Sequence, residues 1–324
     1  MAVKNQVLEL FESNKGIYFS GEELAQKLSV SRTAVWKAVK VLRADGYSID
    51  AVPNKGYCLS EKTDIPSPQG IQKYLLPVCK AVNVQVMPVV SSTMTVVREK
   101  AAAGVPEGYI VLANEQTEGR GRRGRSFESP GGSGIYMSLL LRPVHYTSEQ
   151  AVRITTIAAV AMCEAIEEVL DKTAQIKWVN DIFIQDKKVC GILTEASIDM
   201  ESGLLKYAIM GIGINVYPPQ GGFPADLKQI AGALSDTPQS DLKNRLAAGF
   251  INHFMTYYSA LDRVNYTEAY RKRSMATGRQ VQVLSGTQTR KALVLGIDDD
   301  CQLLVRYEDG TEATLSSGEI SIKL

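Results

Sequence analysis

Apolar residues recur at helical spacing near the start of the chain and predict three helices followed by a hairpin. The first apolar stripe covers residues 3–11. Ser20 and Glu23 have the spacing of a capping box, which begins a second helix, and Ser31 is placed to cap a third. Short alternating segments then flank a turn at 53–56, which is typical of a β-hairpin. Three helices and a hairpin in this order predict a winged helix-turn-helix domain.

The third predicted helix has an exposed face that is basic and carries hydroxyl groups. Cations suit phosphate contacts and hydroxyls suit phosphates or base edges, so this face is typical of a recognition helix in a major groove. The alternative is a three-helix protein-interaction domain, but the basic face and a basic hairpin tip together favour DNA. The face carries Arg32, Thr33, Trp36, Lys37, Lys40 and Arg43. The candidate DNA-binding residues are Ser31, Arg32, Thr33, Lys37, Lys40 and Lys55.

A polar linker with two prolines at 63–68 separates this domain from a larger one. Strands dominate there, which predicts an α+β domain with a mixed or antiparallel sheet. The expected strands are 81–90, 109–113, 135–141, 182–184, 188–196 and 204–214, and the expected helices are 94–103, 149–170 and 241–261. Short strands with acidic turns follow from 278 and predict a small SH3-like β-barrel. The predicted domains are 1–65, 66–275 and 276–324.

Composition is that of a globular protein and narrows the chemistry. The chain has 324 residues, 45% hydrophobic and 22% charged, with a formal net charge of +1, so any nucleic-acid contact must come from a local patch. Five cysteines without paired spacing indicate reduced thiols, and there is no apolar leader or membrane-length run. We therefore expect a cytoplasmic protein that does not contact membranes. The chain has only two histidines, which argues against a histidine-centred triad or metal cluster.

The most unusual stretch is GRGRRGR at residues 119–125, between two apolar strands. Glycines allow a close backbone approach to a ligand, and guanidinium groups attract anions. The run matches the dinucleotide pattern G-x-G-x-x-G, but a Ser/Gly/Pro-rich stretch and a strand follow it where that pattern requires a helix. We interpret the run as a flexible loop that binds a nucleotide's phosphates and a carboxylate. On composition alone, a solvated basic loop or a nucleic-acid patch is an equal alternative.

Three further motifs follow this loop: KWVND at 177–181, KVCGIL at 188–193 and GIGIN at 211–215. In this order the four motifs resemble those of the biotin–protein ligases. The winged helix predicted in front is similar to that of the bifunctional bacterial form, which also represses biotin genes. The resemblance covers essentially the whole chain and implies a central fold related to class II synthetases. It also implies ATP and Mg²⁺ as cofactors and biotin as the substrate.

The resemblance further implies a reaction in two steps. Biotin's carboxylate attacks the α-phosphate of MgATP to give biotinyl-5'-AMP, and a lysine of a biotin carboxyl carrier domain of a biotin-dependent carboxylase then attacks this anhydride. The same adenylate acts as the corepressor, so the loaded chain is expected to bind operator DNA as a homodimer. Two alternatives stay open: a sensor that binds biotin without catalysis, and a related ligase that uses lipoate or another acyl acid.

The residues that match the family motifs carry groups suited to these roles. Cations neutralise the two anions that must meet, and hydroxyl and amide groups suit biotin's ureido ring. The expected catalytic residues are Lys188, Arg120, Arg122 and Asp181. The expected biotin-binding residues are Ser92, Thr93, Gln116, Arg120, Gly121, Arg122, Lys188 and Gly191. The expected ATP- and adenylate-binding residues are Arg120, Arg122, Phe127, Asn180, Lys188, Asn215 and Phe223, and no residue is expected to ligate a metal.

Several of these residues also have a purely structural interpretation. Ser92 and Thr93 can cap the helix that follows them, Lys188 can be merely solvated, and Asp181 can cap the end of a strand. The functional interpretation depends on the resemblance, and no departure from the family pattern removes a charge from the chemistry. The sequence departs from that pattern at Ser91, Met94, Phe127 and Val179, where Asp, Asn, Trp and Pro are usual.

Overall fold

The computed structural model describes residues 2–143, 145–147, 150–260, 265–285, 288–316 and 318–322. By their contacts the residues form two compact units. The first consists of Met1–Lys80 and Thr237–Ala248, and the second of Ala81–Asp236 and Gly249–Leu324. A segment from late in the chain therefore belongs to the N-terminal unit, which the polar linker at 63–68 did not indicate.

The first unit has the predicted winged helix-turn-helix arrangement. Ser20 Oγ accepts the Glu23 N–H at 3.0 Å and the Glu23 carboxylate accepts the Ser20 N–H at 3.3 Å, which confirms the capping box. Ser31 Oγ caps the third helix by accepting the Ala34 N–H at 3.2 Å. The elements are α1 (Val3–Glu12), α2 (Gly21–Leu28), α3 (Arg32–Ala44), β1 (Ile49–Val52), β2 (Gly56–Leu59), α4 (Pro68–Gln72) and the 3-10 turn η1 (Pro77–Cys79). One core joins the helices to the hairpin through Val7, Phe11, Leu24, Val35, Leu42 and Leu59, all fully buried.

The second unit is organised around one seven-stranded sheet. Its strands, in spatial order, are β3 (Asn83–Val90), β4 (Tyr109–Gln116), β5 (Gly134–Leu141), β9 (Leu205–Asn215), β8 (Lys187–Ile198), β7 (Asp181–Ile184) and β6 (Gln175–Lys177). β3 and β4 pair in parallel and the other neighbours pair antiparallel, which confirms the predicted mixed sheet. Because β5 pairs with β9, the strand after the arginine-rich loop lies beside the strand of the GIGIN motif.

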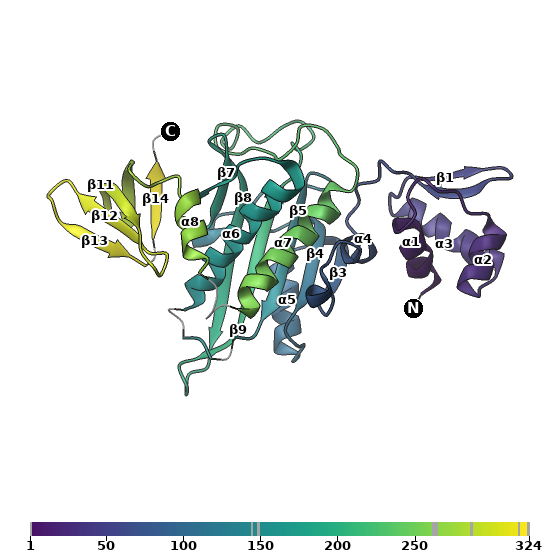
Figure 1. Ribbon diagram of the computed structural model, residues 1–324, viewed down its shortest axis with the longest axis horizontal. Helices are drawn as coiled ribbons and strands as arrows, with labels where there is room; N and C mark the ends of the chain where they lie inside the picture. Colours follow the sequence, from purple (N-terminus) through teal and green to yellow (C-terminus); the bar gives the residue numbers. More distant parts are fainter. Residues whose placement is uncertain are drawn as a thin grey trace. The chain divides into compact units, whose positions relative to one another are not determined.

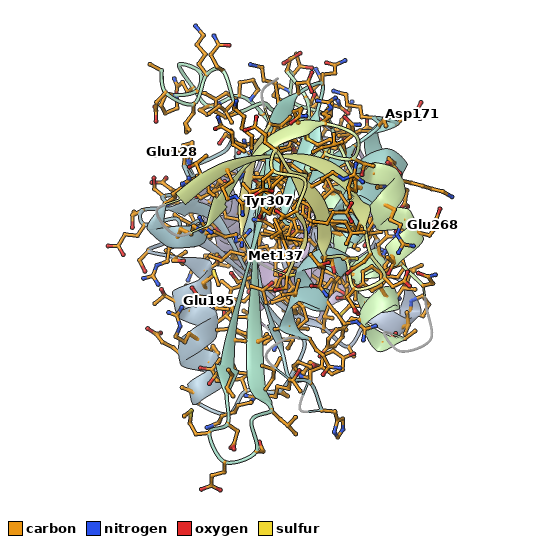
Figure 2. All side chains as sticks on the ribbon, turned by 90° about the vertical axis from the view of Figure 1, so that its left-hand side faces the viewer. Glu128, Met137, Asp171, Glu195, Glu268 and Tyr307 are labelled. Carbon is orange, nitrogen blue, oxygen red and sulfur yellow. The ribbon has the colours of Figure 1, made fainter. Side chains whose placement is uncertain are left out.

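Helices cover the two faces of this sheet. α6 (Ala151–Leu170) and α7 (Leu242–Ser259) lie across one face, and α8 (Thr267–Arg273) lies beside α6 (Figure 1). Residues 157–163 of α6 are all buried, as expected for a helix packed on several sides. α5 (Thr93–Ala102) packs on the sheet through a cluster that includes Met94, Leu140 and Ile209. In the view down the sheet, Asp171 at the end of α6 lies on the opposite side from Glu128 after the arginine-rich loop (Figure 2).

The C-terminal part of the second unit is a five-stranded antiparallel sheet of the predicted SH3-like kind. Its strands are β10 (Gln280–Ser285), β11 (Gln288–Ile297), β12 (Leu303–Tyr307), β13 (Glu312–Leu315) and β14 (Glu319–Ile322), in the order β13-β12-β11-β10-β14. The sequence pattern missed β6, β14, α4 and α8, which are all short. The expected helix ends at Glu149 and Leu261 lie outside the described residues. Among the helices that the structure describes, none has the length and apolar character needed to cross a membrane.

Candidate active site

A pocket opens on the α5 side of the large sheet, and glycines of β8 and β9 are among its lining residues. Gly191 of β8 is paired with Gly213 of β9, and Gly211 is paired with Ser138 of β5. A Cβ atom added to Gly213 would lie 2.4 Å from the ring of Phe127, and one added to Gly211 would lie 2.9 Å from the sulfur atom of Met94. The glycines therefore leave the room that the Phe127 and Met94 side chains occupy in the pocket wall.

The lining of this pocket is strongly positive. The described lining residues include one carboxylate, that of Asp181. Such an excess of positive charge suits a ligand with several negative charges. Apolar side chains, among them Met137, Leu193 and Ile212, line the rest and suit an uncharged ring system. The cationic lining residues are Arg120, Arg122, Arg123, Arg125, Lys177 and Lys188.

The arginine-rich loop forms a closed turn over the pocket. The Gly121 N–H donates to the Arg125 carbonyl at 2.7 Å, and the Phe127 N–H donates to the Gly119 carbonyl at 2.9 Å. Between them, η2 (Arg122–Gly124) contains Arg123 with φ of 56°. Gly119 is required by space, since a Cβ atom there would lie 2.2 Å from the Phe127 carbonyl oxygen. That this loop is flexible and binds phosphates and a carboxylate stays a prediction.

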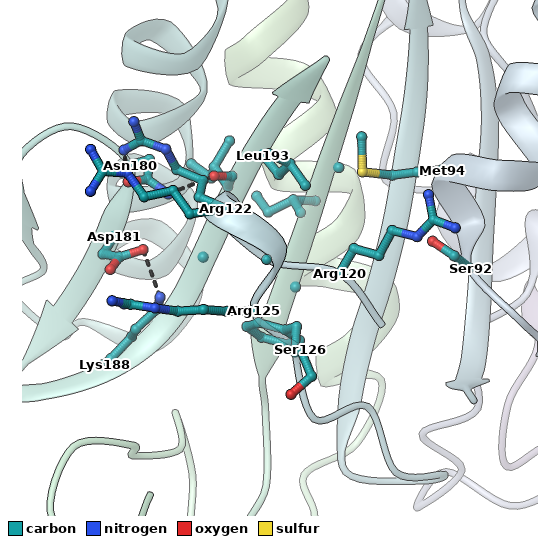
Figure 3. Close-up of a pocket in the computed structure, with 18 of the residues that line it drawn as sticks. Ser92, Met94, Arg120, Arg122, Arg125, Ser126, Asn180, Asp181, Lys188 and Leu193 are labelled. Carbon is teal, nitrogen blue, oxygen red and sulfur yellow. Dashed lines mark hydrogen bonds and ion pairs between the residues drawn. The ribbon is translucent and has the colours of Figure 1, made fainter. Parts of the chain in front are cut away.

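The two arginines expected to be catalytic point to different ends of the pocket. Arg122 donates to Asn180 Oδ1 at 3.0 Å and to the Gly318 carbonyl at 3.3 Å. Asn180, 8% exposed, is fixed in turn because its Nδ2 donates to the Ile192 carbonyl at 2.7 Å. Arg120 reaches the other way, toward Ser92 and Met94 (Figure 3). The loop thus presents one guanidinium group to each end.

Lys188 lies between the pocket and the segment 216–233. Its Nζ is 2.7 Å from Asp181 Oδ1, so the lysine is not merely solvated. Its backbone N–H donates to the Ile230 carbonyl at 2.7 Å, and its carbonyl accepts the Gly232 N–H at 2.9 Å. These bonds hold the end of the Pro- and Gly-rich segment 216–233 beside the Lys188 side chain.

The interpretation of Ser92 as a helix cap through its side chain is wrong. Ser92 occupies the N-cap position of α5, but its hydroxyl makes no capping hydrogen bond. Gln116 Oε1 instead accepts a hydrogen bond from the Thr93 N–H, at 2.9 Å, at the start of α5. Ser92 Oγ is buried, has no hydrogen-bond partner within the described residues, and belongs to the pocket lining. A ligand is therefore free to satisfy it.

Thr93 and Gln116 are already engaged with each other and with their surroundings. Thr93 Oγ1 lies 2.7 Å from Ser138 Oγ, and it donates to Gln116 Oε1 at 3.1 Å. Gln116 Nε2 donates to Ser129 Oγ at 3.0 Å. Both residues line the pocket, but much of their hydrogen-bonding capacity holds α5, β4 and the chain after the loop together.

Asn215 and Phe223 are not among the described lining residues. Asn215 Nδ2 donates to the Gly232 carbonyl at 3.1 Å, so it fastens the segment 216–233 to β9. Phe223 is half-buried within that segment. Their contact with a nucleotide stays a prediction that needs this segment to fold over the ligand.

The C-terminal sheet contributes to the pocket in a way that the sequence did not indicate. Ile320 of β14 is a lining residue. Trp178, which also lines the pocket, is 4% exposed, and its Nε1 donates to the Cys301 carbonyl at 2.9 Å. Together with Arg122 and Gly318, these contacts tie the loop and the pocket wall to the SH3-like sheet. No local sequence signal marks such contacts.

The candidate DNA-binding residues lie together in the first unit. Arg43 differs from them, since its guanidinium donates to the Ile49 carbonyl and so holds the hairpin against α3. Lys55 is at the hairpin tip, with its Nζ 5.8 Å from the centre of the Tyr18 ring. Ser31, Arg32, Thr33, Lys37, Lys40 and Lys55 are all exposed.

Known protein families match the winged helix, the domain with the large sheet and the C-terminal sheet. Profiles described as "HTH domain", "Biotin/lipoate A/B protein ligase family" and "Biotin protein ligase C terminal domain" match residues 3–58, 86–215 and 277–323. The protein from Bacillus subtilis named bifunctional ligase/repressor BirA is 35% identical over 324 residues, covering 97% of both chains. Its Escherichia coli namesake is 28% identical over 319 residues, covering 95% of this chain and 94% of its own.

A solved structure is similar over most of the chain. The biotin protein ligase from Aquifex aeolicus in complex with biotin and ATP superposes with a TM-score of 0.63 at 26% identity, covering 74% of this chain and 98% of its own. Fold and site thus define the class, a winged-helix domain joined to a ligase domain with a cationic pocket that is lined in part by glycines. The chain belongs to the bifunctional biotin–protein ligase/repressor family, because a 35% identical relative aligns along 97% of it.

Proposed function

We propose that the chain is an ATP-dependent biotin–protein ligase that also represses transcription with biotinyl-5'-AMP as corepressor. The observation that carries the ligase half is the pocket itself, whose described lining residues include glycines, six cationic residues and one carboxylate. ATP and a carboxylic acid together bring several negative charges, and the apolar part of the lining suits a bicyclic ring. The bifunctional relatives and the winged helix support the repressor half.

In the first step the biotin carboxylate attacks the α-phosphorus of ATP, the new carboxyl–phosphate bond forms, and pyrophosphate leaves. Both reactants are anions, so their approach is opposed by charge repulsion. Arg120, Arg122 and Lys188 would offset this repulsion and stabilise the charge that develops on the α-phosphate oxygens. Arg120 at one end and Arg122 at the other would fix the two reactants in line for attack.

In the second step a carrier lysine attacks the biotinyl carbonyl, an amide bond forms and AMP leaves. The carrier lysine must first lose a proton, and Asp181 is the carboxylate among the described lining residues of the pocket. Asp181 is held by Lys188 at 2.7 Å. Because a bound carboxylate or phosphate competes for the Lys188 ammonium group, ligand binding would loosen this ion pair and leave Asp181 free to accept the proton.

Segment 216–233 would protect the anhydride from water. Hydrogen bonds from Lys188 and Asn215 hold its C-terminal end beside the pocket. We expect the rest, with Phe223, to fold over the adenine, with Phe127 and Asn180 as further nucleotide contacts. Exclusion of water lengthens the lifetime of a reactive acyl phosphate.

Mg²⁺ would supply charge neutralisation on the triphosphate when it is bound. Over the ranges of the chain that can be described, no group of three or more His, Cys, Asp or Glu side chains could hold a metal ion. Asp181, already paired with Lys188, is the carboxylate that a bound ion would meet in the pocket. This donor set fits an ion that arrives on the nucleotide phosphates, as Mg²⁺ commonly does.

For repression we propose a homodimer of the adenylate-bound chain on operator DNA. One winged helix makes few phosphate contacts, and specific binding usually pairs two half-sites. The proposed division into 1–65, 66–275 and 276–324 assigns DNA binding to the first domain and chemistry to the other two. We also propose that the protein is cytoplasmic. Its protein substrates would be the carrier domains of carboxylases.

The test is biotin-dependent release of pyrophosphate from MgATP without any carrier protein. A burst of about one pyrophosphate per chain that then stalls is expected, because the adenylate forms and is retained. A second assay offers lipoate in place of biotin, with free biotin as competitor. It distinguishes a biotin ligase from a related ligase that uses another acyl acid. If folded protein binds biotin but releases no pyrophosphate, the chain is a sensor and the proposed ligase function is wrong.

A further inference from the structure

Trp36 is a largely exposed aromatic residue that lies outside the buried core of the first unit. It is 52% exposed on α3, whereas the chain's other tryptophan, Trp178, is 4% exposed. Val35, Val39 and Leu42, which are buried on another side of α3, pack in the core of this unit. A half-exposed indole leaves a large apolar area in water, and such a surface commonly marks a binding site.

The neighbours of Trp36 indicate what it meets. At about 100° per residue, Arg32 lies on one side of Trp36 along the helix surface and Thr33 and Lys40 lie on the other. Lys40 Nζ is 5.4 Å from the centre of the indole ring. A hollow between α3 and the hairpin is lined by Arg32, Thr33, Trp36, Val52, Pro53 and Asn54, among others. The indole thus stands in the middle of the basic surface that we propose for DNA.

We infer that Trp36 reads a thymine by covering its C5-methyl group in the major groove. The inference rests on the proposed repressor function, because it needs the winged helix on its operator. Contacts to phosphate position a protein but carry no sequence information. Among the four bases, thymine presents a methyl group in the major groove, and it is read by apolar contact. Lys40, whose Nζ lies near the ring, adds a cation for the nearby backbone.

The experiment uses the full chain with biotin and MgATP. Wild-type protein first selects tight-binding duplexes from a randomised library. Each thymine of a selected duplex is then replaced in turn by deoxyuridine, which keeps the base pair and lacks only the methyl group. We expect one replacement per half-site to weaken wild-type binding about fourfold, the factor for one buried methyl-sized group. Trp36→Ala should bind the thymine duplex more weakly than wild type. Replacing that thymine by deoxyuridine should leave the affinity of Trp36→Ala unchanged.

Two control variants separate this contact from general effects. Val41→Ala removes another exposed apolar side chain of α3, 45% exposed and absent from the hollow, and should keep the full methyl sensitivity. Lys40→Ala should weaken binding to thymine and deoxyuridine duplexes alike and reduce the salt dependence. Trp36→Phe keeps an aromatic ring and should retain part of the sensitivity.

The outcomes are distinct. If duplexes are selected but no thymine is methyl-sensitive, or if the sensitivity persists in Trp36→Ala, the inference is wrong and the repressor function stands. If wild-type protein that has released pyrophosphate selects no duplex, the repressor half of the proposed function fails and the inference fails with it.

Discussion

The pocket and the basic face of α3 both use arginine and lysine, but in opposite ways. In the pocket, Arg122 and Lys188 come from distant segments and are held by Asn180 and Asp181. On α3, Lys37 and Lys40 come from one helix and are exposed to solvent. Cations held by partners suit one ligand geometry, whereas exposed ones adjust to a row of phosphates. Substitutions should therefore be strongly coupled in the pocket and nearly independent on α3.

The largest effect is expected for Lys188→Ala. It removes the cation beside Asp181 and leaves a carboxylate facing two anionic reactants, so adenylate formation should fall about 100- to 1,000-fold. The measurement is the rate of biotin-dependent pyrophosphate release, with thermal unfolding to show that the fold is intact. Lys206→Ala, an exposed lysine on β9, is the matched control and should behave as wild type. Normal turnover by the Lys188 variant would remove this residue from the site.

Arg122→Gly should release the adenylate about 10- to 100-fold faster, the effect of about one or two charge-assisted hydrogen bonds. Arg122→Lys keeps the charge but loses the geometry that reaches both Asn180 and Gly318, so it should be intermediate. The assay traps released biotinyl-5'-AMP over time. The double variant with Lys188→Ala should lose less than the product of the two single effects. Independent effects would contradict the coupled pocket.

Asp241 gives the first unit a pH-dependent stability. Burial alone would raise its pKa, but hydrogen bonds from Lys73, Tyr74, Asn244 and Lys15 outweigh burial and lower the pKa to about 2. A lowered pKa contributes stability above the unfolded value of about 4, and this contribution is lost as the pH falls from about 4 to 2.

Asp241→Asn should therefore lower the free energy of unfolding of the first unit by about 2 kcal/mol at neutral pH. The difference from wild type should shrink between about pH 4 and pH 2, as chemical unfolding at several pH values would show. Asp45→Asn, which removes an exposed carboxylate paired with Lys4, is the control and should change stability little. A difference that is the same at pH 2 and pH 7 would contradict this interpretation of Asp241.

The smallest effects are expected on α3. Lys37→Ala and Lys40→Ala should each weaken operator binding severalfold and each lower the slope of log affinity against log salt by about 1. The double variant should show the product of the two effects, and pyrophosphate release should be unchanged. Strong coupling between these lysines would mean that the face is as rigidly organised as the pocket.

The sequence determined the features that depend on neighbours along the chain. The capping box of Ser20 and Glu23, the turn at 53–56 and the alternation of strands are local, so their hydrogen bonds and periodicity are written in adjacent residues. The arginine-rich loop was recognisable for the same reason, because its glycines and cations are contiguous. With the motifs in order, this was enough for the α+β class, the winged helix and the ligase family.

Only the tertiary structure decided which distant groups meet. Whether Ser92 caps α5 depends on Gln116, which lies on β4 and accepts the Thr93 N–H instead. The pairing of Trp178 with the Cys301 carbonyl and the membership of 237–248 in the first unit likewise join segments far apart in the chain. A donor or acceptor can form a hydrogen bond with many chemically equivalent partners along the chain. Which of them it contacts depends on which groups the packed fold brings within hydrogen-bond distance.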